Sequence, residues 1–145
     1  MTLDIRGSLK NTRKSKNALV VVDELIANSI DAFLIRRATT QGDLNLEIKF
    51  SVQAKRIDLL GHEYDLEIEC LDNGCGLGPD QLKAFLTKDT SYKDDLSIPG
   101  IGNCKGAGRV QFFHHFSKLS LSSMYLEGGN KYYVYLPAEE NRKEL

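Results

Sequence analysis

The sequence predicts an α+β fold: a two-layer α/β sandwich whose helices gather on one face of a mixed, mostly antiparallel sheet. The first observation is an apolar stretch at residues 18–37, which has the length and composition of a core helix. The second is that segments of alternating apolar and polar residues come in two pairs. The four segments are 44–52, 64–70, 119–123 and 132–136. Because strands arrive in pairs, strand and helix do not alternate as they would in a doubly wound sheet.

Length and composition bound the class of protein. The 145 residues suit one domain with a core, and 41% apolar with 27% charged residues is ordinary for a soluble globular protein. A net charge of −1 gives the whole molecule no attraction to nucleic acid or membrane. Three cysteines without zinc spacing, no signal peptide and no membrane-length apolar run make the cytoplasm the expected location, with no membrane partner.

The chain divides into a basic leader at 1–17, one domain at 18–138 and a charged tail at 139–145, without an internal repeat. We expect the leader to be solvated and partly disordered; the alternative is that its cations contact phosphates. Ser15 is the expected cap of the long helix, which should end near Thr39.

The long helix carries three polar side chains on one face. Glu24, Asn28 and Asp31 are spaced i, i+4 and i+7, so at about 100° per residue they lie within roughly 60° of one another. Burying unpartnered polar groups is costly, which indicates partners from outside the helix. We interpret those partners as a nucleotide with a magnesium ion.

The second strand runs into Asp72-Asn-Gly74-Cys-Gly76-Leu-Gly, and Pro79 then begins a helix with DQLKAFL. A carboxylate beside glycines at a strand end can accept a hydrogen bond from an exocyclic amine such as that of adenine. The alternative is an ordinary Asp-Asn-Gly turn.

Residues 88–105 lack periodicity and predict a mobile loop, and a helix is expected at 106–117. Between them, the glycines of 100–109 precede a helix start, where backbone amides form an anion cradle. Lys105 and Arg109 add positive charge. The alternative is a flexible linker. Neither the P-loop nor the dinucleotide-binding pattern is present.

Taken together, these motifs resemble those of the GHKL ATPase superfamily, which includes gyrase B, the ninety-kilodalton heat-shock chaperones, histidine kinases and MutL. Residues 24–32 (ELIANSIDA) look like its N box, residues 72–76 (DNGCG) like its D-x-G-x-G box, and residues 105–109 (KGAGR) like its glycine box. The three motifs occur in the family's order. The resemblance implies the Bergerat ATP-binding fold.

The resemblance also implies roles for individual residues. Glu24 would be the general base and Asn28 the magnesium ligand, while Asp72 would bind the adenine amine. Thr87 to Lys93 lies where mismatch-repair members carry a Thr-Ser-Lys stretch, and we assign it no contact. The remaining nucleotide-binding residues that the resemblance implies are Asp31, Ala32, Gly74, Gly76, Lys105, Gly106, Ala107, Gly108 and Arg109.

The expected function is therefore magnesium-dependent ATP binding and hydrolysis by a module with a mobile lid, acting as a switch of a larger assembly. Glu24 favours hydrolysis, because water needs a base and histidine kinases do not rely on this glutamate. Two alternatives remain: a histidine-kinase-type catalytic domain and a non-catalytic ATP-gated binding module. The expected partners are ATP and ADP, a second copy through ATP-dependent closure, and a DNA or protein client. Related proteins continue into more strands beyond the position of Leu136, so turnover of this module alone should be slow.

Overall fold

The computed structural model describes residues 4–17, 19–87, 92–101, 108–140 and 142. The helices and strands follow the predicted order, with one additional helix at the start of the chain. They are α1 (Ile5–Asn11), α2 (Val20–Thr39), β1 (Ile48–Arg56), β2 (Tyr64–Asp72), α3 (Pro79–Leu86), the 3-10 turn η1 (Asp94–Leu96), α4 (Val110–His115), β3 (Leu121–Glu127) and β4 (Asn130–Leu136).

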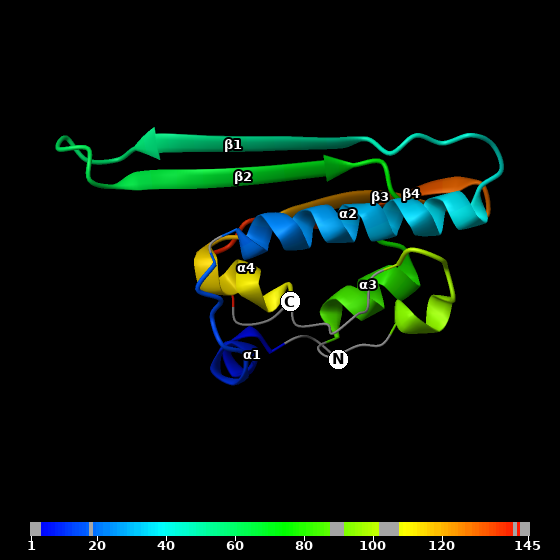
Figure 1. The fold of residues 1–145 in the computed structure, drawn as a ribbon, viewed down its shortest axis with the longest axis horizontal. Helices are drawn as coiled ribbons and strands as arrows, with labels where there is room; N and C mark the ends of the chain where they lie inside the picture. The colour runs from blue at the N-terminus through cyan, green and yellow to red at the C-terminus, as the bar shows by residue number, and fades with distance from the viewer. Residues whose placement is uncertain (1–3, 18, 88–91, 102–107, 141, 143–145) are drawn as a thin grey trace.

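Helix α2 is the element around which the others are arranged (Figure 1). It contacts β2 and α4, and the β1–β2 hairpin runs along one side of it while α1, α3 and α4 lie on the opposite side. The predicted helix and its end at Thr39 are confirmed. The predicted cap is wrong: the Asn17 side chain accepts a hydrogen bond from the Leu19 amide at 3.0 Å, and Ser15 instead accepts one from the Asn17 amide.

The strands form two antiparallel hairpins. β1 pairs with β2 in a register that places Phe50 opposite Cys70, and β3 pairs with β4 with Leu121 opposite Leu136. Pairing of the strands is thus as predicted. Among the described residues, however, the hairpins are two separate two-stranded sheets and not parts of one sheet. The α+β class is confirmed at this coarser level.

The first hairpin is less buried than its alternating sequence suggests. One face of the hairpin carries Phe50 and Val52, which lie two residues apart on β1. Leu66 lies on the same face, because it is two residues from Ile68, the cross-strand partner of Val52. Val52 is nevertheless 56% exposed and Leu66 45%. Figure 1 shows the hairpin extending past the beginning of α2, so part of it does not run beside that helix.

The leader contains a helix that packs against the rest of the chain. Helix α1 begins at the Asp4 cap, whose carboxylate accepts a hydrogen bond from the Gly7 amide at 3.0 Å. Ile5 is 2% exposed and lies in an apolar cluster with Leu9, Phe85, Leu86, Phe113, Leu119 and Leu136. Within the leader that was expected to be solvated and partly disordered, the structure thus shows a helix whose buried isoleucine anchors an otherwise basic segment to the core.

Between α3 and α4 the structure describes residues 87, 92–101 and 108–109; η1 lies within 92–101 and is followed by Ser97 with a φ of 51°. The other residues of this segment lie outside the described ranges, and the mobility expected for residues 88–105 stays a prediction. No helix in the described part of the chain has the length and apolar character needed to cross a membrane.

Candidate functional site

The predicted polar face of α2 is a continuous chain of polar contacts. The Asn28 amide donates to Glu24 Oε1 at 2.9 Å, one helical turn away. Lys93 Nζ donates to Asn28 Oδ1 at 2.8 Å and to Asp31 Oδ2 at 2.6 Å. The four side chains therefore lie side by side, as the spacing of the three helical residues predicts.

One partner of the polar face of α2 is a residue of the same chain, Lys93. We interpreted the outside partners as a nucleotide and magnesium, whereas the structure shows the ammonium of Lys93 paired with Asp31. The Asp31 side chain is only 9% exposed, so a cation in contact with it offsets much of the cost of burying its charge.

Asp72, the last residue of β2, lies against an adjoining part of α2. Its Oδ2 accepts a hydrogen bond from the hydroxyl of Ser29 at 3.1 Å, and its Oδ1 accepts one from the Gly74 amide at 2.8 Å. Ser29 is buried and directly follows Asn28, so the end of β2 is held one residue along the chain from the magnesium ligand that the resemblance implies. Asp72 itself is exposed to solvent.

The glycines after Asp72 permit close packing. A Cβ at Gly74 would overlap the Cβ of Ala32, and the next amide, of Cys75, donates to the Ala32 carbonyl at 3.0 Å. Gly76 has a φ of 74°, and a Cβ there would overlap the carbonyl oxygen of Met124 in β3. Ala32 therefore forms the surface on which the Asp72 loop rests.

The cysteine in this loop is held as a neutral thiol. Burial, with a smaller contribution from the nearby Asp72 carboxylate, raises the pKa of Cys75 to about 11. Cys70 and Cys75 are both free thiols, and Cys104 lies outside the described residues. Cys75 is therefore suited to packing rather than to nucleophilic chemistry.

The end of the glycine box meets the beginning of α2. A Cβ at Gly108 would overlap the carboxylate of Glu24, so this backbone lies directly against the predicted base. Arg109 is buried; its guanidinium donates to the Thr87 carbonyl and lies 5.7 Å from the centre of the Phe85 ring, which joins α4 to α3. Lys105, Gly106 and Ala107 lie outside the described residues, so their predicted phosphate contacts remain predictions.

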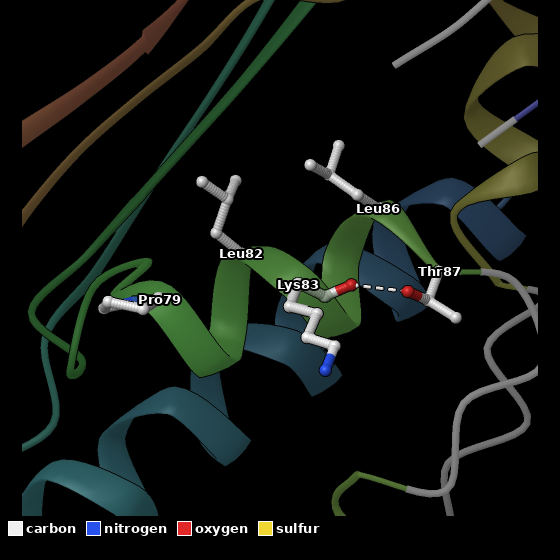
Figure 2. A pocket seen from close by; sticks show the side chains of 5 residues that line it. All are labelled: Pro79, Leu82, Lys83, Leu86 and Thr87. Atoms are coloured by element: carbon white, nitrogen blue, oxygen red, sulfur yellow. Dashed lines mark hydrogen bonds between the residues drawn. The ribbon is translucent and has the colours of Figure 1, made fainter. Parts of the chain in front are cut away.

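One hollow of the described chain lies away from the predicted site residues. It measures about 300 Å³ and is lined by Pro79, Leu82, Lys83, Leu86 and Thr87 along α3, as Figure 2 shows. A second, smaller hollow lies on the β1–β2 hairpin, lined by Ser51, Gln53, Glu67 and Glu69. Neither includes Glu24, Asn28 or Asp72. Within the described ranges, no three His, Cys, Asp or Glu side chains form a ready-made metal site.

Two residues of the site were not assigned from the sequence. Ser29 follows Asn28 in the N-box-like stretch, and a serine this deep in an apolar helix is the signal that could have revealed it. Lys93 ends the Thr87 to Lys93 stretch, to which the sequence assigns no contact, and its ammonium reaches Asp31.

In comparisons with known proteins, no family model, no curated protein and no solved structure matches this chain.

Proposed function

We propose that this chain is a magnesium-dependent ATP-binding and ATP-hydrolysing module of the GHKL type, built on a Bergerat fold and acting as a nucleotide switch. The observation that supports it most is the hydrogen bond from Asn28 to Glu24, with Gly108 packed against the same carboxylate. An acid, an amide and glycine-rich backbone from two distant segments meet there, which is what the motif order predicts.

Asn28 and Glu24 have different proposed roles: Asn28 would bind magnesium and Glu24 would act on the attacking water. Because the amide nitrogen of Asn28 donates to Glu24, its oxygen faces away as an acceptor, the atom type that magnesium prefers. The oxygen donors of this face fit the ion, which takes few ligands from protein and several from phosphates and water. When bound, magnesium would neutralise charge developing on the transferred phosphate. Glu24 would accept a proton from the attacking water.

Asp72 would supply base recognition. Ser29 and the Gly74 amide each hold one of its carboxylate oxygens, and every carboxylate oxygen keeps further acceptor capacity for an adenine amine. Gly74 and Gly76 let the loop pack closely against Ala32 and Met124, and this packing sets the position of the carboxylate. Lys105 to Ala107 would hold the terminal phosphates, a role carried over from the resemblance alone.

Two variants test this proposal separately. Glu24→Gln should bind ATP in the presence of magnesium but release phosphate at least about 100-fold more slowly, because general-base catalysis contributes that much. Asp72→Asn should bind ATP about 10-fold or more weakly, since the amide cannot accept as strongly from an amine. Binding by calorimetry and phosphate release by a coupled assay measure the two effects.

The matched controls are Glu127→Gln and Asp65→Asn, which make the same chemical changes at exposed strand positions. If Glu24→Gln hydrolyses ATP like the parent, Glu24 is not the base. If the parent binds ATP but releases no phosphate, even at concentrations that favour dimers, the chain is a non-catalytic ATP-gated module.

A further inference from the structure

Lys93 stands where a cation is needed in the proposed nucleotide site. Its ammonium is 2.6 Å from Asp31 Oδ2 and 2.8 Å from Asn28 Oδ1, and its side chain is only 21% exposed. We propose that Lys93 is a positioning residue that fills the cation position of the α2 site and keeps free magnesium out until a nucleotide brings the metal in. This inference rests on the proposed function, because it assigns Asn28 Oδ1 to magnesium.

The competition follows from the shared oxygen. Asn28 Oδ1 is the acceptor for the ammonium and also the proposed ligand of the metal. Magnesium binds oxygen at about 2.0–2.1 Å and gives up its waters reluctantly, so it needs an uncrowded, electron-rich oxygen. An ammonium already bound to that oxygen repels a second cation at short range. A free metal ion brings nothing to compensate for the repulsion.

A bound nucleotide changes the competition between Lys93 and magnesium for the Asn28 oxygen. Its phosphates are anions that an ammonium binds well, and they supply most of the ligands of the metal. Lys93 can then exchange its contact with Asn28 for one with phosphate while the metal takes the amide oxygen. Asp31 keeps a cation beside it throughout, which its buried carboxylate requires. The expected consequence is that metal and nucleotide bind together and not independently.

Removal of the Lys93 charge tests the inference. Mn²⁺ serves as the probe, without nucleotide, and its binding is followed by electron paramagnetic resonance. Lys93→Gln should bind Mn²⁺ at least about 10-fold more tightly than the parent, since two oxygens lose their competing cation. Lys93→Arg, which keeps the charge, should bind it as weakly as the parent.

Lys118→Gln is the matched control, because Lys118 also pairs with a carboxylate, that of Glu140, at 3.6 Å and on an exposed surface. It should leave Mn²⁺ binding unchanged. Equal Mn²⁺ affinity in Lys93→Gln and the parent overturns the inference. If Lys93→Gln does not unfold cooperatively, and so is not folded, Mn²⁺ binding to the parent protein tests the inference instead. Micromolar binding of free Mn²⁺ to the parent contradicts the inference. Binding of Mn²⁺ that becomes tight only with a non-hydrolysable ATP analogue supports it.

The inference and the proposed function can fail separately. If the parent binds no ATP analogue but Lys93→Gln gains Mn²⁺ affinity, the proposed function is wrong and the exclusion of metal by Lys93 stands. If the parent binds the analogue and Lys93→Gln gains no Mn²⁺ affinity, the proposed function stands and the role of Lys93 is wrong.

Discussion

Because Gly74 has no side chain, the Asp72 loop can approach α2 closely at this position. A Cβ at this position would overlap the Cβ of Ala32 and approach the Asp72 carboxylate within 2.8 Å of Oδ1. The Cys75 amide bonded to the Ala32 carbonyl fixes the loop at this distance. The placement of Asp72 beside Ser29 therefore depends on two small residues that face each other.

A double-mutant cycle tests this contact. Gly74→Ala should lower the free energy of unfolding by about 1–3 kcal/mol, because the loop must move away from α2. Ala32→Gly alone should cost about 1 kcal/mol of helix stability. The double variant removes the overlapping methyl group, so its loss should be smaller than the sum of the two by at least about 0.5 kcal/mol. Urea denaturation measures all three, and strictly additive losses would show that the residues do not touch.

Individual site residues could be predicted where the local sequence carries the information. Glu24, Asn28 and Asp31 lie on one helical face because helical periodicity fixes it, and the structure brings them together as expected. Lys93 could not be assigned this way, since 62 residues separate it from Asp31 and its segment has no periodicity. Only the folded chain shows which carboxylate an isolated lysine reaches.

At the scale of elements, α1 is the clearest departure from expectation. Its sequence, IRGSLKN, is short, basic and contains a glycine, so its own propensity for helix is weak. The helix is instead stabilised by the Asp4 cap and by packing against α4. α4 also holds the segment that follows, because the Gln111 side chain donates to the Arg13 carbonyl and accepts from the Ser15 amide, each at 2.9 Å. Local patterns do not contain these contacts.

Truncation of Ile5 tests whether α1 belongs to the core. Ile5→Ala should lower the free energy of unfolding by about 2–5 kcal/mol, the range for deleting a buried isoleucine side chain. Arg6→Ala is the control, because Arg6 is exposed on the same helix and should change stability by less than about 0.5 kcal/mol. Thermal or urea unfolding followed by circular dichroism measures both. Equal free energies of unfolding for Ile5→Ala and Arg6→Ala would show that α1 does not pack as part of the core.

At the scale of the whole molecule, the sequence predicts the class and the pairing of strands but not their assembly. Alternation and turn residues locate both hairpins, whose registers depend on local turns. Whether two hairpins join into one sheet depends on contacts between distant segments. In the described chain the hairpins remain separate, linked by a hydrogen bond from the Leu77 amide, just after β2, to Ser123 Oγ in β3 at 2.9 Å.

The arrangement around α2 gives the whole molecule its proposed role. This helix meets the Asp72 loop, Lys93 and Gly108, which come from three separate stretches of the chain. A ligand bound among them would link these stretches and stabilise the folded state in proportion to the logarithm of its concentration.

Calorimetric titration of the intact chain with a non-hydrolysable ATP analogue and magnesium tests this account most directly. We predict saturable binding of one nucleotide per chain, weakened at least about 10-fold by Asn28→Ala, which removes the proposed magnesium ligand. The exposed substitution Asn130→Ala serves as the control and should leave the affinity unchanged. Absence of binding at millimolar nucleotide, or equal affinity in the parent and Asn28→Ala, would contradict the account.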